Sequence, residues 1–375
     1  MSKKTFIINS NSENLQPLVN LIEELAKKNY AFSLLTNQMN DCLSKYFNDQ
    51  KWQLKKIYFG PTAGSFLKNL IFLIIYLPLF FSCLIFFGYL KYEQQVDLIF
   101  CFGWNEKLLI APVAKLLKIK CIWLELPGTN YSQHKSLWLY KIYAGWTNII
   151  VLNGATKNKL EKLGIKPENI KIIQPGIKLN HFNFQDTIFN KLAQAENIQK
   201  KFFTIGTIGE FDSQQKMEPL LMAIKKCLTV VPNIQLIVVG EGKERKNLAW
   251  MAKKIEIDTV VWFVGEQAHL RKWLESFDLF VVSSETLKLN DMVIALNAMS
   301  AGLPIIGADN YGLDDLVFEN KTGALLKFDS EALADEIIKL AQDKFLREKY
   351  GNAGKERVEK YFNLSKMVEH FEKVL

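Results

Sequence analysis

Small and charged residues follow two predicted strands in the second half of the chain, at positions where they could hold a phosphate group. They are Gly209, Glu210, Lys216, Gly240 and Gly242. Glycine lets backbone N–H groups approach a phosphate, the N-terminus of the following helix favours an anion, and lysine adds a point charge. Ordinary βα turns use the same glycines, so this pattern alone fits a plain turn equally well.

A third candidate phosphate-binding segment is FVVSSETLKLNDMVIALNAMSAGLPIIG, which we interpret as strand, loop, helix and strand. The helix is predicted to begin near Asp291. The free N–H groups of Asp291, Met292 and Val293 would then be available to a pyrophosphate. Asn297, within two turns of that end, would reach a ribose hydroxyl.

These positions depend on strands that alternate with helices along most of the chain. The predicted strands are 5–9, 31–35, 54–59, 97–102, 121–126, 148–152, 169–174, 202–209, 234–240, 260–265, 279–284, 304–307 and 323–328. The predicted helices are 15–28, 108–117, 135–143, 156–163, 217–231, 243–255, 291–300, 331–343, 345–362 and 365–375. This alternation of strands and helices predicts two parallel sheets covered by helices. Ligands of such sheets bind beyond the carboxyl ends of the strands, so a site in a cleft between two domains is expected.

Charge is unevenly distributed along the 375 residues. Residues 1–185 contain 22 lysines, no arginine and 11 acidic residues, a net charge of +11, whereas the remainder carries −3. An anionic partner is expected for the first half, although a lysine-rich proteome would give the same bias. The five cysteines form no C-x-x-C pair and the four histidines have no ligand spacing. We therefore expect a reducing compartment and no metal site.

Residues 69–90 form an uncharged apolar run, and a membrane span needs about 20 such residues. A single crossing would separate strands that we assign to one sheet. Pro78 removes a helical hydrogen bond, so we expect two short helices that enter one leaflet and return, with Lys51, Lys55 and Lys56 near anionic head groups. The alternative is a buried crossover helix. The residues expected to associate with the membrane are Lys68, Phe72, Pro78, Phe80, Phe81, Phe86, Phe87 and Lys91.

Six sequence elements follow one another in the second half, over about 120 residues. They are Gly209-Glu210 with Lys216, VGEG (239–242), WFVG (262–265), SSE (283–285), NAMSAGLP (297–304), and GLDDLV (312–317) with TGALL (322–326). In type and order they resemble the C-terminal domain of the family 4 glycosyltransferases. The first half resembles that family more loosely, least of all over residues 1–95.

The resemblance implies a GT-B fold, with two Rossmann-like domains facing a cleft, and sugar transfer from a nucleotide donor with retention of configuration. It implies no metal or other cofactor and identifies no catalytic nucleophile. The residues that it assigns to the nucleotide-sugar site are Gly209, Glu210, Lys216, Gly240, Gly242, Phe263, Glu285, Asp291, Met292, Val293 and Asn297.

The chain departs from the family pattern within this site. Glu210 stands where the family has a phosphate-binding arginine, and Asn297 where it has a ribose-binding glutamate. The family's other carboxylate should lie eight residues before Asn297, at Leu289, and Glu285 takes that role only if the loop contains an insertion. An unpaired anion about 5 Å from a diphosphate costs roughly 3 kcal/mol at an effective dielectric constant of 20.

Two functions follow from these observations. The first is a glycosyltransferase at the cytoplasmic face of the membrane, peripheral or monotopic, acting on a lipid-linked or cell-envelope glycan acceptor. The second is a catalytically silent GT-B protein that serves an active transferase as a scaffold. A nucleic-acid partner is not expected, because no recognition motif is present and residues 1–185 lack arginine.

The predicted domains are residues 1–190, with the apolar insertion 69–90, and residues 191–360, with the linker in 182–202. The last segment, 361–375, is predicted to be a helix that packs back towards the first domain.

Overall fold

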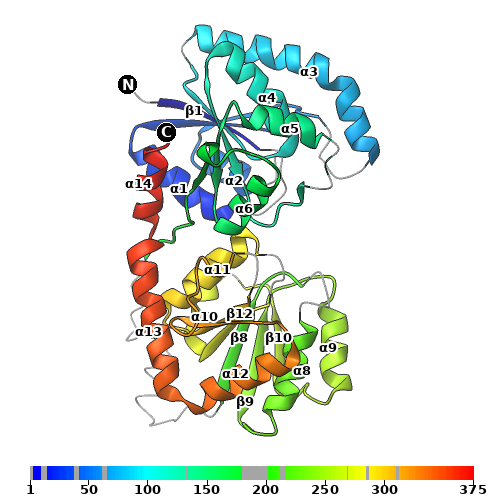
Figure 1. Cartoon of the computed structure of the whole chain (residues 1–375), viewed down its shortest axis with the longest axis vertical. Helices are drawn as coiled ribbons and strands as arrows, with labels where there is room; N and C mark the ends of the chain where they lie inside the picture. Colours follow the sequence, from blue (N-terminus) through cyan, green and yellow to red (C-terminus); the bar gives the residue numbers. More distant parts are fainter. Residues whose placement is uncertain are drawn as a thin grey trace. The chain divides into compact units, whose positions relative to one another are not determined.

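The computed structural model describes residues 3–9, 15–37, 42–60, 66–93, 95–131, 134, 136–179, 202–211, 217–267, 269–283, 287–309 and 312–375. The chain forms two compact units (Figure 1). Unit 1 comprises Met1–Pro175, Lys288–Asn290 and Leu364–Leu375, and unit 2 comprises Gly176–Leu287 and Asp291–Asn363. The first division therefore falls after Pro175, rather than at the predicted residue 190. The predicted linker lies almost wholly outside the described residues.

Unit 1 is built on a parallel sheet in the order β3-β2-β1-β4-β5-β6-β7. Its strands are β1 (Lys3–Ile8), β2 (Tyr30–Thr36), β3 (Gln53–Lys56), β4 (Leu98–Cys101), β5 (Lys120–Glu125), β6 (Asn148–Val151) and β7 (Ile170–Ile172). Every residue of β4 is buried. Central strands of this kind are apolar on both faces because helices cover both faces of a parallel sheet.

Unit 2 repeats this topology in the order β10-β9-β8-β11-β12-β13. Its strands are β8 (Phe203–Ile208), β9 (Ile234–Val239), β10 (Val261–Gly265), β11 (Leu279–Val282), β12 (Ile305–Ala308) and β13 (Gly323–Leu326). In each sheet the strand order reverses beside the first strand, between β1 and β4 in unit 1 and between β8 and β11 in unit 2. These reversals mark where each sheet is expected to bind a ligand.

Most of the helices occupy the predicted segments. They are α1 (Gln16–Lys27), α4 (Trp104–Leu117), α5 (Leu137–Ala144), α6 (Gly154–Lys162), α8 (Glu218–Cys227), α9 (Arg245–Lys254), α11 (Leu289–Ser300), α12 (Ser330–Gln342), α13 (Lys344–Tyr361) and α14 (Leu364–Glu372). Two short helices were not predicted, α2 (Cys42–Asp49) and α10 (Leu270–Ser276). Their lengths give few turns over which a helical period can be recognised.

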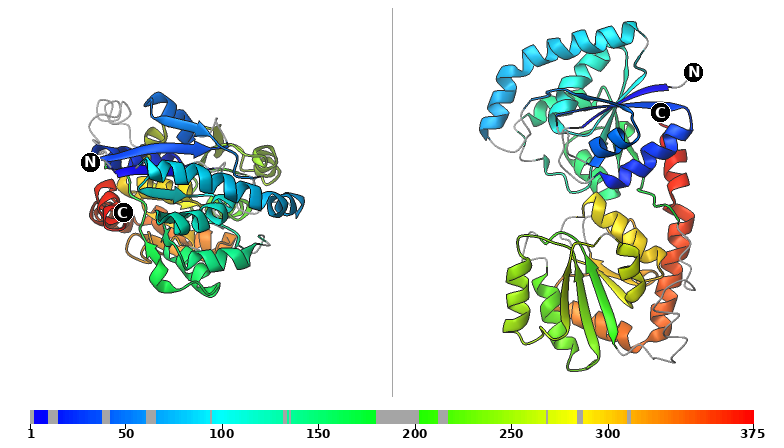
Figure 2. Two further views of the ribbon diagram at one scale, coloured as in Figure 1. Left: turned by 90° about the horizontal axis from the view of Figure 1, so that it is seen from above. Right: turned by 180° about the vertical axis from the view of Figure 1, so that it is seen from behind.

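The apolar run forms a single helix, α3 (Phe66–Tyr92), so the prediction of two short helices was wrong. Pro78 lies inside this helix, where a proline removes one backbone hydrogen bond. Packing on both sides of the proline holds the helix together, since Phe72 and Phe87 are buried and the Tyr76 hydroxyl donates to Leu108 O of α4 (3.1 Å). The helix lies along α4 on the outside of unit 1 (Figure 2). The sheet is continuous from β3 to β4, as the argument against a single crossing requires.

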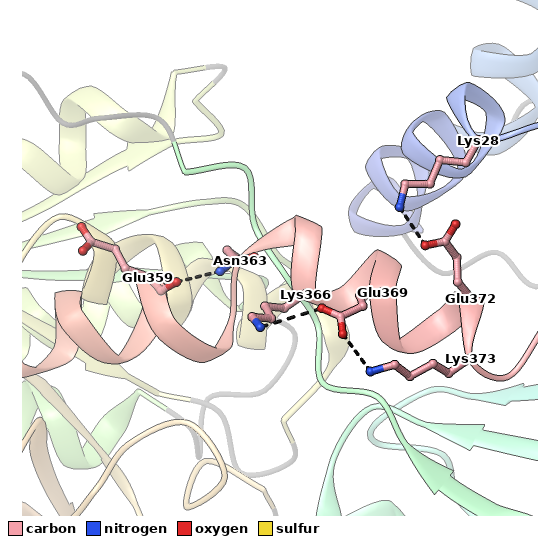
Figure 3. Close-up of polar contacts among 7 residues, drawn as sticks. All are labelled: Lys28, Glu359, Asn363, Lys366, Glu369, Glu372 and Lys373. Atoms are coloured by element: carbon pink, nitrogen blue, oxygen red, sulfur yellow. Dashed lines mark hydrogen bonds and ion pairs between the residues drawn. The ribbon is translucent and has the colours of Figure 1, made fainter.

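The C-terminal helix α14 belongs to unit 1, where it packs on α1. Lys28 at the end of α1 pairs with Glu372 (2.7 Å), as Figure 3 shows. Lys120 Nζ donates to the carbonyl oxygens of Val374 (2.6 Å) and Leu375 (2.9 Å). The chain thus returns to unit 1 after completing unit 2.

Candidate functional site

The loops that follow β8, β9 and β10 are tied together at the carboxyl edge of the unit 2 sheet. Phe211 N donates to Glu241 O (3.0 Å), and Gly240 N donates to Gly265 O (2.8 Å). These bonds connect the ends of three neighbouring strands. They satisfy backbone groups that would otherwise need other partners, and they make the loops one surface.

Two glycines allow this close approach. A Cβ atom on Gly240 would lie 2.0 Å from the carbonyl oxygen of Gly209, and Gly240 has a φ of +132°. A Cβ atom on Gly242 would lie 2.3 Å from the carbonyl oxygen of Phe211. Around Gly209 a Cβ atom would meet nothing within 4 Å. Gly240 and Gly242 are therefore required by the loop packing itself, whereas Gly209 borders open space.

Hydroxyl groups meet at the strand reversal of unit 2. Thr207 of β8 and Ser283, just after β11, place their oxygen atoms 3.2 Å apart. The helix that follows β11 in the chain is α11, and its residues from Asp291 onward belong to unit 2.

Helix α11 begins at Leu289, two residues before the predicted start. Leu287 and Met292 are buried in one apolar cluster, an arrangement that fixes the entry of the chain into a helix. The first turn therefore contains Leu289, Asn290 and Asp291, and the predicted positions Met292 and Val293 follow it.

Unit 1 has a buried ionic network at the carboxyl edge of its own sheet, which the sequence reasoning missed. Glu125 ends β5 and pairs with Lys107 of α4 at 2.7 Å, and these side chains are 1% and 4% exposed. The Tyr140 and Tyr131 hydroxyls donate to the same carboxylate at 2.6 and 3.0 Å. Burial, together with the Glu125 charge, raises the pKa of both tyrosines well above its usual value. A carboxylate within an apolar strand was the available signal, because it needs a buried partner.

This network supports an aromatic stack. The indole of Trp104 stacks with the Tyr140 ring (centroids 4.6 Å apart) and with the His134 ring (3.9 Å apart). The Trp104 ring nitrogen also donates to Ser136 Oγ (2.8 Å). Burial and then the Lys107 charge lower the pKa of His134. A half-buried, neutral imidazole is thus held at the edge where β4 and β5 end.

Helix α3 presents a second unusual surface in unit 1. Its buried stripe includes Phe72, Cys83, Phe87 and Leu90. The opposite stripe follows helical spacing and consists of Ile74, Leu77, Phe81, Ile85, Tyr89 and Tyr92, each at least 56% exposed. We call these six residues the α3 stripe. By length and composition the Ile71–Tyr92 part of α3 is apolar enough to cross a membrane, and little of it is buried.

Comparison with known proteins gives a family match for part of the chain. Residues 189–357 match the family described as "Glycosyl transferases group 1". The match covers less than half of the chain and identifies this region as similar to group 1 glycosyltransferases. It covers nearly all of unit 2, including the glycine-bearing loops and α11, and it confirms the family resemblance seen in the sequence.

Two curated relatives and one solved structure illustrate the similarity. An N-acetyl-alpha-D-glucosaminyl L-malate synthase of Bacillus anthracis is 29% identical over 168 residues, 44% of this chain and 43% of that protein. A phosphatidyl-myo-inositol mannosyltransferase of Mycobacterium leprae is 28% identical over 166 residues, 42% of each protein. The chain thus matches less than half the length of these relatives. The Anabaena protein HepE, solved in complex with UDP, has a TM-score of 0.79 over 99% of both chains at 15% identity. That likeness confirms the predicted GT-B fold.

Within the glycosyltransferase domain, the predicted residues have different local roles. Asn297 Nδ2 donates to Val293 O one turn earlier (2.7 Å), so one of its two amide hydrogens is already used within α11. Phe263 packs its ring on the unit 2 core, and its carbonyl accepts from Arg245 Nη2 (3.1 Å). Glu210 is exposed. Lys216 and Glu285 lie outside the described residues.

The residues predicted to associate with the membrane fall into a buried group and an exposed group. Phe72 and Phe87 belong to the unit 1 core, because α3 needs a buried stripe to pack on α4. Phe80 and Phe86 pack partly against that core. Phe81, Pro78 and Lys91 are exposed, and the Lys68 side chain lies outside the described side chains. The exposed apolar surface of α3 is thus the α3 stripe. The sequence did not distinguish this stripe from the buried side of the helix. Among the described residues, no group of three or more metal-binding side chains converges.

Proposed function

We propose that this protein is a glycosyltransferase that moves a sugar from a nucleotide-sugar donor to an acceptor at a membrane surface. The family match over residues 189–357 carries the proposal. In this reaction the bond between the sugar C1 and the diphosphate oxygen breaks, a bond between C1 and an acceptor oxygen forms, and the acceptor hydroxyl proton is released. We further propose retention of configuration and no metal requirement, as the family resemblance implies.

The donor is assigned to the carboxyl edge of unit 2. Open space beside Gly209 and the Thr207–Ser283 hydroxyl pair are suited to a diphosphate. The complex of HepE with UDP supports a nucleotide donor. Leaving-group charge would be stabilised by these fixed dipoles, the kind of contribution that usually dominates such transfers.

The acceptor is assigned to unit 1 and to a lipid-linked or cell-envelope glycan. The α3 stripe offers an apolar face with lysines near it, which suits a protein that lies on the cytoplasmic face of an anionic membrane. The relative that acts on a phosphatidyl-myo-inositol supports a lipid acceptor. At the carboxyl edge of unit 1, His134 is the group best placed to hydrogen-bond an acceptor hydroxyl.

Calorimetric titration with UDP- and GDP-sugars tests the donor assignment. We expect saturable binding that is lost in Gly240→Ala, because the added Cβ atom would lie 2.0 Å from the carbonyl oxygen of Gly209 and displace the loop. Glu210→Arg should strengthen binding, because it replaces a repelled charge with an attracted one. No binding of any nucleotide sugar by the wild type or by Glu210→Arg would refute the proposal.

A second candidate, a catalytically silent scaffold, is favoured by the Asn297 side chain, which bonds to its own helix. The same titration separates the two functions. A scaffold would bind no nucleotide sugar yet would still float with vesicles. An enzyme would bind one and release the nucleoside diphosphate when a lipid acceptor extract is added.

Vesicle flotation tests the membrane assignment. Ile74→Asp with Ile85→Asp places two charges on the α3 stripe and should abolish flotation on vesicles that contain phosphatidylglycerol. Both residues are more than 70% exposed, so the fold should survive. Leu116→Asp, an equally apolar exposed position on α4, is the matched control. Wild-type protein that ignores anionic vesicles would refute the assignment.

A further inference from the structure

A groove runs between the end of β3 and the middle of α3 in unit 1. Its volume is about 520 Å³. The β3 side contributes Lys55, Lys56, Ile57, Tyr58 and Phe59, and the α3 side contributes Leu79, Ser82, Cys83, Phe86 and Phe87. We call it the β3–α3 groove. Its size falls within the range of about 300–1,000 Å³ that is usual for small-ligand sites.

The groove combines two positive charges with an apolar interior. Lys55 and Lys56 are exposed, and no carboxylate among the described residues lies within ion-pair distance of either. No acidic residue lines the groove. Phe59 and Phe87 are fully buried beneath it, and Leu79 and Phe86 are partly exposed. A ligand that matches this lining carries a negative head and an apolar chain.

The surroundings favour a lipid over a soluble anion. The groove is formed by the same helix that exposes the α3 stripe, so a protein resting on that stripe would bring the groove to the level of lipid head groups. Tyr58 stands beside the lysines and is 55% exposed, an aromatic residue of the type common at membrane interfaces. Free phosphate would gain from the lysines alone and would leave the apolar wall unused.

We propose that the β3–α3 groove binds one anionic phospholipid. The phosphate is held by Lys55 and Lys56, and one acyl chain lies along Leu79 and Phe86. This proposal rests on the membrane attachment proposed above and deepens it. The α3 stripe gives general apolar adhesion, whereas the groove selects a charged head group and fixes the rotation of unit 1 on the surface.

The test uses a short-chain phosphatidylglycerol below its micelle concentration, so that binding requires no bilayer. Calorimetry should give one site per wild-type chain and clearly weaker binding of the matching phosphatidylcholine and of inorganic phosphate. Lys55→Ala with Lys56→Ala should weaken binding roughly 30-fold, because each lysine beside an anionic lipid contributes a factor of about five. Ser82→Trp keeps both lysines but fills the exposed mouth, and should also abolish binding.

The matched control is Lys162→Ala with Lys171→Ala, which removes the same charge from exposed positions on α6 and β7. It should leave binding of the short-chain lipid unchanged. If both double lysine variants lost the same lipid affinity, net charge alone would explain the effect and the groove site would be overturned. Unchanged binding in Ser82→Trp, or equal affinity for phosphatidylcholine, would also overturn it. Wild-type protein that ignores anionic vesicles but still binds the short-chain lipid would refute the membrane attachment alone and leave the groove site standing.

Discussion

The buried pair between Lys107 and Glu125 gives the sharpest stability prediction. At an effective dielectric constant of about 20, two unit charges 2.7 Å apart attract by about 6 kcal/mol. The cost of removing both charges from water offsets part of this attraction. Taking away one partner is different, because the other charge remains buried. We expect Lys107→Met to lower the free energy of unfolding of unit 1 by about 3–5 kcal/mol.

The two tyrosine hydroxyls that donate to Glu125 remain in this variant and moderate the loss, since each bond to a charged group is worth about 1.5–3 kcal/mol. Removing both charges together, in Lys107→Met with Glu125→Gln, leaves neither ion uncompensated. The double variant should therefore lose less than the sum of the two single variants, by at least about 2 kcal/mol.

Urea unfolding followed by tryptophan fluorescence measures these differences, with Trp104 and Trp123 as reporters in unit 1. Lys157→Met is the matched control, because its partner Glu161 lies 3.7 Å away and both side chains are 32% exposed. That exposed pair should contribute less than about 1 kcal/mol. If Lys107→Met lost no more than the control, or if the losses in the double variant simply added, the reasoning about burial would be refuted.

Three further predictions concern the glycine loops, the His134 imidazole and the partly buried Arg357. Gly240→Ala should lower the free energy of unfolding of unit 2 by about 1–3 kcal/mol, because the new Cβ atom would meet a carbonyl oxygen, while Gly209→Ala should be close to neutral in the same urea titration. The folded state keeps the pKa of His134 below its usual 6.5, so the unfolded chain binds a proton first. Stability should therefore fall as the pH drops below about 6.5, and His134→Gln should flatten that slope in thermal melts; an unchanged slope would count against the burial of this ring. Arg357→Lys should cost about 1–2 kcal/mol in differential scanning calorimetry, since the guanidinium donates to two carbonyl oxygens (2.7 and 2.8 Å) and stacks on Phe318 at 3.5 Å. An unchanged melting temperature would show that the planar guanidinium of Arg357 is not needed for stability.

The order of strands and helices could be predicted from the sequence because each element carries its own period. Runs such as LIVVG (236–240) and LIFCF (98–102) are apolar throughout, which is typical of strands in a parallel sheet covered on both faces. Glycines at strand ends and the NAMSAGLP segment carried the resemblance to the glycosyltransferase family. Short helices such as α2 were not predicted because they offer few turns of periodicity. The start of α11 was misplaced because the burial of Leu287 and Met292 in one apolar cluster fixes it.

The candidate site could be predicted only where its residues adjoin in sequence. The sequence identified Gly240 and Gly242, but the reason for these glycines is contact with loops about 30 residues earlier in the chain. The pairing of Lys107 with Glu125, and of Trp104 with His134, joins residues 18 and 30 positions apart. No local pattern specifies such a pair, because it forms only when neighbouring strands end at the same edge of a sheet.

By itself, then, the sequence determined the two alternating α/β halves, the family resemblance and an apolar run long enough to span a membrane, because these follow from local composition, periodicity and short motifs. Only the tertiary structure decided which stripe of the helix formed by that run is buried and which is exposed. A helix that is apolar on every side carries no preference of its own, and packing on α4 makes the choice. The same packing brought Lys55 and Lys56 beside an apolar wall that lies about 25 residues further along the chain.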